Sequence, residues 1–194
     1  MPSPLASLED NSREINVRSP RYYIARTIYL CRHCGSPTAL VGIAVPLGHE
    51  TLDVDDDAAQ EGGETSQPEH PAAAWSTADH NAFLFYVDSL PAAVWKRINR
   101  YQPAYRPPDP DAGATPAQDP AAAGCSDSYL ANHCEKCGCR LDDHELFCEP
   151  EGPFLPTSAS AAAAIRLVPV DEPFEACAAG YSFEPPLFYA MTRG

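Results

Sequence analysis

The sequence predicts an α+β fold, mostly β, with a zinc-ribbon core built from two distant Cys-x-x-Cys-Gly motifs and with an acidic and helical insertion. Three observations lead to this prediction. The two cysteine motifs, at residues 31–35 and 134–138, match each other. Runs rich in β-branched and apolar residues, which favour strands, flank the first motif. The segments predicted most clearly as helices, at 91–101 and 159–164, are short.

Composition and charge restrict the possible functions. The chain has 194 residues with 21 Pro and 11 Gly, below the content of low-complexity chains, and its length suits one domain. A formal net charge of −14 argues against binding to the outside of DNA, RNA or anionic lipid. The sequence contains no run of about 18 apolar residues, so it predicts no transmembrane helix. The first residues lack a secretory signal pattern, so we expect a cytoplasmic protein.

The first cysteine motif is predicted at the tip of a hairpin. Residues 1–20 are polar and uneven, and we expect them to form a tail or a loosely docked arm. Residues 21–30 contain many β-branched and aromatic side chains, which predicts the strand that enters the motif. Residues 38–46 predict the strand that leaves it. The motif and the two strands therefore predict one zinc-knuckle hairpin.

The middle of the chain combines an acidic stretch, an apolar run and an amphipathic helix. No Lys or Arg occurs from residue 33 to 95, and residues 50–74 predict a solvated acidic loop. Residues 82–88 fit a strand or a buried helix, because periodicity does not decide between them. Ser89 is the predicted cap of a helix at 91–101. Its predicted apolar face carries Val94, Trp95 and Ile98, and its basic face, which could pair with the acidic loop, carries Lys96, Arg97 and Arg100.

The last third contains the second motif and a further strand. Residues 106–125 are rich in Pro and Ala and predict a flexible linker. Residues 129–132 lead into the second motif. The strand predicted at 165–170 is placed at a sheet edge, because Pro169 has no backbone N–H to donate. Other expected elements are a short helix or turn at 141–147, a helix at 159–164 capped by Ser158, and an aromatic tail at 183–191 that docks on the core.

The eight cysteines indicate metal binding rather than disulfides in a chain without a signal pattern. Two residues between paired cysteines form a tight turn that points both sulfurs at one ion, and the following glycine accepts a positive φ. Two such turns supply four thiolates, the closed tetrahedral set of a structural Zn²⁺ site, although iron suits the same donors. The predicted ligands are Cys31, Cys34, Cys134 and Cys137.

Two alternatives to a shared site are a redox-active pair and two separate partial sites. A redox pair normally opens a helix, whereas Pro37 and Thr38 lead into an extended run. A shared ion would close a loop of about 100 residues, so 1–194 is predicted to be a single metal-stapled domain. Other thiols and histidines are expected to be bystanders or substitute ligands, namely Cys125, Cys139, Cys148, Cys177, His33, His133 and His144.

The acidic loop at 50–74 has three interpretations. It is a solubilising loop, a negative surface for a basic protein partner, or a calcium loop. The calcium interpretation is the weakest, because the glycine and closing glutamate of an EF-hand do not fit.

A set of strings around and after the second motif resembles a group of uncharacterised bacterial zinc-ribbon proteins. The strings are Asn132-His133-Cys134-x-x-Cys137-Gly138, Asp142-Asp143, Glu149-Pro150-x-Gly152-Pro153-Phe154-x-Pro156, Asp171-Glu172-Pro173-Phe174-Glu175-Ala176 and Gly180-Tyr181-Ser182. The similarity covers roughly 21–49 and 80–194. It implies a cysteine-bound metal and a cytosolic bacterial protein, and it implies no activity.

Three classes of function follow as hypotheses. The first is a non-enzymatic protein whose acidic surface binds a protein partner, for example to neutralise a toxin or a nucleic-acid-binding protein. The second is an enzyme that uses carboxylates near the second motif. The third, nucleic-acid binding, needs a basic stripe, and only 96–106 is locally basic. The candidate catalytic groups of the second class are Asp142, Asp143, His144, Glu149, Glu151 and Cys177 beside Glu175.

Overall fold

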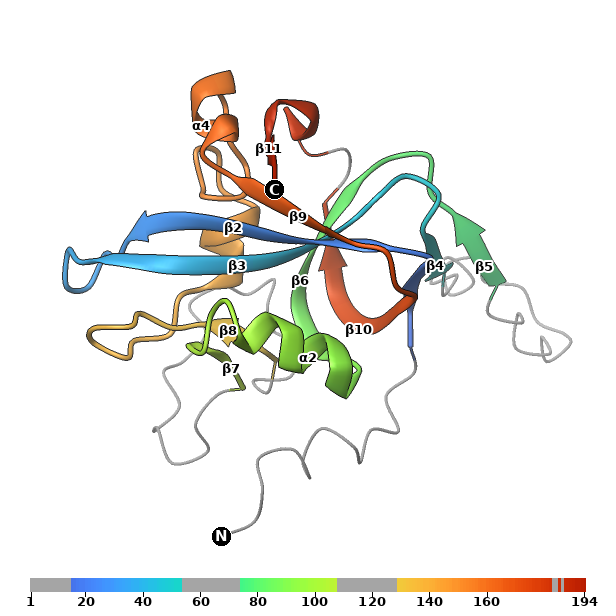
Figure 1. The fold of residues 1–194 in the computed structure, drawn as a ribbon, viewed down its shortest axis with the longest axis horizontal. Helices are drawn as coiled ribbons and strands as arrows, with labels where there is room; N and C mark the ends of the chain where they lie inside the picture. The colour runs from blue at the N-terminus through green and yellow to red at the C-terminus, as the bar shows by residue number, and fades with distance from the viewer. Residues whose placement is uncertain (1–14, 54–73, 108–128, 183–184, 186) are drawn as a thin grey trace, which may run out of the picture.

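A twisted nine-stranded sheet organises the fold (Figure 1). The computed structural model describes residues 15–53, 74–107, 129–182, 185 and 187–194. The strand order in the sheet is β11-β9-β2-β3-β6-β10-β1-β4-β5, and every pair is antiparallel except β11 with β9. The strands are β1 Val17–Ser19, β2 Tyr22–Leu30, β3 Pro37–Val45, β4 Glu50–Asp53, β5 Ala74–Thr77, β6 Ala82–Ser89, β9 Arg166–Val170, β10 Phe174–Tyr181 and β11 Thr192–Arg193.

The smaller elements lie around this sheet. A two-stranded ladder pairs β7 (Tyr105–Arg106) with β8 (Ala131–Asn132). The helices are α2 Ala92–Asn99, α3 Asp143–Phe147, α4 Ala159–Ala163 and the 3₁₀ turn η3 Phe188–Ala190. The described fold is therefore mostly β with short helices, which confirms the predicted α+β class. Within the described residues, no helix is long and apolar enough to cross a membrane.

The hairpin of β2 and β3 confirms the strands predicted around the first motif. The register runs without a break from Tyr23 opposite Ala44 to Leu30 opposite Pro37, so the cysteine turn lies at the hairpin tip. Side chains alternate between the two faces of the sheet, as the pleat requires. Ile24 and Ile43 face one apolar cluster, whereas Ala25 and Ala44 face another.

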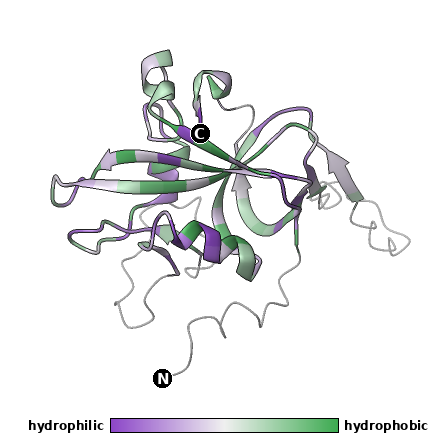
Figure 2. Cartoon of the chain, viewed as in Figure 1, coloured by the Kyte–Doolittle hydropathy of each residue, from purple (hydrophilic) through white to green (hydrophobic). Residues whose placement is uncertain are grey.

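Two apolar cores cover the two faces of the sheet. One contains Val94 and Ile98 of α2, which agrees with the predicted apolar face of that helix. Figure 2 shows both hydrophobic and hydrophilic turns on α2, as expected for an amphipathic helix. The other core contains a group of aromatic side chains from β6, α3, the loop after α3 and η3. These side chains are Phe83, Phe147, Phe154 and Phe188. The burial of Phe188 confirms that the C-terminal segment docks on the core.

The apolar run at 82–88 is a strand, and this changes the predicted start of the next helix. Ser89 is the last residue of β6 and pairs with Cys177 of β10, so it does not cap the helix. The helix instead follows Pro91, which lacks a side-chain capping bond. Pro91 is the N-cap residue, with a φ of −54° within the range that the proline ring imposes. Later in the chain, the Ser158 side chain accepts from Ala161 N–H and caps the N-terminus of α4, as predicted.

Strand pairing corrects the three segments predicted as irregular. The predicted tail at 1–20 includes β1, which lies between β10 and β4 with Val17 fully buried. The predicted acidic loop at 50–74 begins and ends in the paired strands β4 and β5. The predicted linker at 106–125 begins with Arg106 in β7. Residues 1–14, 54–73 and 108–125 of these three predictions, Cys125 among them, lie outside the described residues.

The edge position predicted for β9 is correct only in part. Tyr23 of β2 lies opposite Pro169, and β11 pairs with the opposite side of β9 at Arg166 and Leu167. Pro169 therefore lies beyond the short stretch that β11 covers, where its missing N–H costs no ladder hydrogen bond.

Candidate metal centre

The two cysteine motifs fold into the same turn. We call residues 31–35 the first knuckle and residues 134–138 the second knuckle. In the first, Gly35 N–H donates to Cys31 O at 2.8 Å and Cys31 N–H donates to Ser36 O at 3.0 Å. In the second, Gly138 donates to Cys134 and Cys134 donates to Cys139, both at 2.9 Å. Both glycines have left-handed φ values, 66° and 71°, which a side chain would strain.

The fold brings the four predicted ligands together as one group. The Sγ atoms of Cys31 and Cys137 are 3.8 Å apart, those of Cys34 and Cys134 are 3.6 Å apart, and all four lie within 4.8 Å of one another. A tetrahedral ion with sulfur bonds of about 2.3 Å has sulfur–sulfur edges of about 3.8 Å. The four cysteines can therefore hold one metal ion, and the donor set suits a thiophilic ion rather than magnesium or calcium.

The thiols have unequal electrostatic environments. Hydrogen bonding to the backbone of Ser36 lowers the pKa of Cys34 to about 6, and the amide of Cys137 lowers the pKa of Cys134. The amide of Cys139 also lowers the pKa of Cys137, but desolvation and the neighbouring sulfurs outweigh it and raise that pKa to about 12. Four adjacent thiolates repel each other unless a cation neutralises them, which is what a metal ion would supply.

A buried amide side chain fixes the second knuckle against the first hairpin. Asn132 accepts from Val41 N–H at 3.0 Å and donates to Val41 O at 2.9 Å. Its side-chain amide therefore bonds to β3 as the backbone of a neighbouring strand would. The hydroxyl of Thr38 accepts from Glu135 N–H at 3.1 Å. These contacts join segments that lie about 90 residues apart in the chain, and they bring the second pair of sulfurs to the first.

Ion pairs attach the first knuckle to the segment that follows the second. Arg32 contacts Glu145 at 2.9 Å and Glu149 at 3.5 Å, and the hydroxyl of Tyr29 donates to Glu145. Desolvation and the bond to Glu145 raise the pKa of Tyr29 to about 12. These residues line a hollow of about 200 Å³ together with residues 150–153.

The other thiols and histidines lie outside the group of four. Cys139 donates to Arg140 O, and Cys148 follows α3. His133 is buried, and its Nδ1 faces the carbonyls of Ala104 and Ala131 at 3.2 and 3.0 Å. None of these side chains, nor His33 or His144, belongs to the cluster that the described residues form around a possible ion.

The catalytic candidates predicted from the sequence do not all converge on one pocket. Asp142 caps α3 by accepting from His144 N–H at 2.7 Å. Glu149 and Glu151 line the hollow, where Glu149 pairs with Arg32. Cys177 lies on β10, opposite Ser89. Glu149 and Glu151 therefore share the hollow, whereas Asp142 and Cys177 lie in other structural settings.

Asp143 is a buried carboxyl, which the sequence does not distinguish from its neighbour Asp142. It is 2 % exposed and accepts from Tyr86 N–H at 2.8 Å. That N–H is oriented by a left-handed φ of 51° at Tyr86. The second oxygen of Asp143 has no hydrogen-bond partner among the described residues. Burial raises its pKa to about 7, and repulsion from Asp142 adds to the shift.

Replacing Asp143 with Asn is expected to change the pH dependence of stability. Because the folded pKa is above the unfolded value of 3.8, the carboxyl stabilises the fold at low pH and this contribution is lost as pH rises to about 7. The wild-type protein should therefore lose on the order of 2 kcal/mol relative to D143N between pH 5 and pH 8. Urea unfolding of both proteins at several pH values measures this difference. If the free energy of unfolding depended on pH in the same way in both proteins, Asp143 would not titrate in this range.

Comparison of this chain with protein-family models, curated protein sequences and solved structures finds no match.

Proposed function

We propose that this chain is a non-enzymatic zinc-binding protein that uses an acidic surface to bind a basic protein partner. The observation that carries the proposal is the closed donor set, because four cysteine sulfurs fill a tetrahedral ion and leave no open position for a substrate. Zn²⁺ is the ion proposed for these donors, and its role is to hold two distant parts of the chain together.

The acidic surface is proposed from the charge and from the place where its segment joins the fold. The chain has 27 acids against 13 Lys and Arg, and residues 54–73 are rich in acids. This segment connects β4 to β5, whose ends, Asp53 and Ala74, lie opposite each other. Both strands lie at one end of the sheet order, away from β2 and β3, which carry the first knuckle. An acidic segment there would steer a basic partner through long-range attraction.

The pairing of Asp53 with Ala74 allows a clean deletion. Replacing 54–73 with a two-residue Asn-Gly turn closes the hairpin in its existing register. A second variant keeps the segment length and changes its Asp and Glu to Asn and Gln. Each is used with the wild-type protein to capture partners from a lysate of the source organism at low and high salt.

The proposal predicts that one basic protein is retained near stoichiometry by the wild type at low salt. Both variants should lose it, and high salt should release it from the wild type. Equal capture by all three proteins would show that the acidic segment is not the contact. Thermal unfolding and metal content of the variants, which should match the wild type, exclude a folding defect.

A further inference from the structure

Positive charge is concentrated in two segments of this acidic protein. Residues 92–107 and 131–141 contain one acid, Glu135, in a chain whose net charge is −14. Arg97 pairs with Glu172 at 2.5 Å, and the guanidinium of Arg140 lies over the ring of Tyr129. The six cations of these segments are Lys96, Arg97, Arg100, Arg106, Lys136 and Arg140, of which Lys96, Arg100, Arg106 and Lys136 are exposed.

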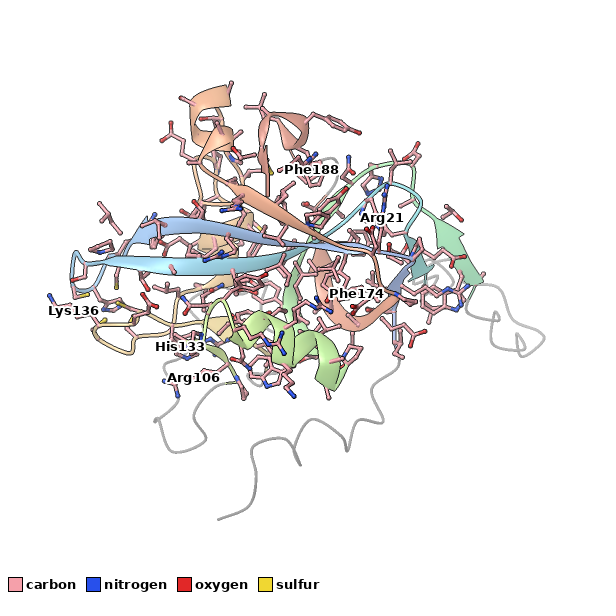
Figure 3. All side chains as sticks on the ribbon, in the orientation of Figure 1. Arg21, Arg106, His133, Lys136, Phe174 and Phe188 are labelled. Carbon is pink, nitrogen blue, oxygen red and sulfur yellow. The ribbon has the colours of Figure 1, made fainter. Side chains whose placement is uncertain are left out.

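The fold places these two segments next to each other. β7 pairs with β8, so that Arg106 lies opposite Ala131, one residue before the buried Asn132. Burial lowers the pKa of His133, and the nearby charges of Arg106 and Arg140 lower it further. Figure 3 shows Arg106, His133 and Lys136 along the same side of the molecule, with Lys136 beside the tip of the β2–β3 hairpin.

Two exposed aliphatic side chains lie beside these cations. Ile28 is 68 % and Leu30 is 64 % exposed, and both are on the same face of β2 because they are two residues apart. Ala39, the cross-strand partner of Ile28, accepts a hydrogen bond from Gln102 and donates one to Glu135. These bonds connect the strand pair directly to both basic segments.

This part of the hairpin also extends beyond its neighbouring strand. β9 pairs with β2 only as far as Arg26, so residues 27–30 have no strand partner on that side among the described residues. The guanidinium of Arg26 lies 4.7 Å from the ring centre of Tyr101, which follows α2. The strand pair that carries the aliphatic pair thus contacts the segment after α2, which contains Arg100 and Arg106, and the second knuckle, which contains Lys136. We call this surface the knuckle face, made of Arg26, Ile28, Leu30, Arg100, Arg106 and Lys136.

We propose that the knuckle face is a docking surface for a polypeptide segment that combines acidic and apolar side chains. An apolar centre bordered by Arg and Lys is the arrangement of a protein interface. Charge complementarity selects an acidic partner, and the unpaired edge of residues 27–30 can accept an added strand. A single-stranded nucleic acid is less well matched, since bases stack on aromatic rings rather than on Ile28 and Leu30. The residues of this surface are different from those of the proposed acidic surface, so this proposal does not depend on the proposed function.

Selection of a random 12-residue peptide library on the full-length protein tests this proposal. The expected peptides combine Asp or Glu with apolar residues, and fluorescence anisotropy then measures their affinity. The double variants I28S/L30S and R106E/K136E should each weaken binding at least tenfold. Matched controls are L47S and R21E, which change an apolar residue that is 58 % exposed and an exposed cation outside the knuckle face. Both controls should bind as the wild type does.

Four results would overturn the proposal. The selected peptides could be basic or uncharged, or binding could persist in both double variants. An oligothymidine of matched length could instead bind more tightly than the peptides and lose affinity in R106E/K136E, which would assign the surface to nucleic acid. Self-association of the wild type that I28S/L30S abolishes would make a second copy the occupant. Metal content and thermal unfolding of all variants, which change only exposed side chains, should equal those of the wild type.

Discussion

Chelation of the metal is expected to abolish the cooperative thermal unfolding of this protein. The free energy of binding Zn²⁺ to four-ligand peptides is about 10–16 kcal/mol, whereas a whole domain is typically stable by only about 5–15 kcal/mol. The ion would also close a loop of 100 residues between Cys34 and Cys134. Without it, the thiols that remain ionised repel each other where the two knuckles meet. We therefore expect the metal-free chain to lose its sharp transition.

Circular dichroism and calorimetry before and after chelation measure this effect, and re-addition of Zn²⁺ should restore the transition. The variant C34S should behave like the chelated protein, because three sulfurs leave the ion incompletely coordinated. C139S is the matched control, since this thiol neighbours the second knuckle but lies outside the group of four. A chelated protein that unfolds cooperatively at an unchanged temperature would contradict a structural role for the ion.

Substitution of Asn132 by Ala is expected to have the second largest effect. The side chain is fully buried and satisfies both the N–H and the C=O of Val41, so its loss leaves two buried backbone groups without partners. Each unsatisfied group costs about 1–3 kcal/mol, so we expect a loss of roughly 2–6 kcal/mol. The same change loosens the second knuckle, so the affinity for the metal should fall as well.

A comparison with Asn81→Ala separates these two consequences. Asn81 is also buried, and it accepts from Leu47 N–H and donates to the hydroxyl of Tyr189. N81A should destabilise the protein without weakening metal binding. Chemical denaturation gives the stability of each variant, and competition with a chromophoric chelator gives its metal affinity. Equal metal affinity in N132A and N81A would show that Asn132 does not position the second knuckle.

Local patterns in the sequence were sufficient to predict the central hairpin and the metal-ligand candidates. The spacing of each Cys-x-x-Cys-Gly motif determines its own turn, and the β-branched and apolar residues of 21–30 and 38–46 favour strands that pair across that turn. The prediction that the two knuckles meet at one ion rests on the match between the two motifs. The first knuckle lies at the tip of β2 and β3, and two apolar clusters on the faces of the sheet form most of the core.

Contacts between distant parts of the chain account for what the sequence did not predict. β1 has only three residues and is stabilised by pairing with β10 and β4, so nothing local distinguishes it from a tail. Asp142 and Asp143 are adjacent acids, and only the contact of α3 with Tyr86 makes one a surface cap and the other a buried carboxyl. The knuckle face likewise depends on the pairing of β7 with β8.

X-ray absorption spectroscopy of the purified full-length chain, combined with elemental analysis, tests the central claim most directly. The claim is that one ion joins Cys31, Cys34, Cys134 and Cys137. It predicts one equivalent of zinc per chain with four sulfur neighbours at about 2.3 Å and no nitrogen or oxygen neighbour. A folded protein that contains no metal, or an ion with two sulfur ligands and nitrogen or oxygen ligands, would contradict it.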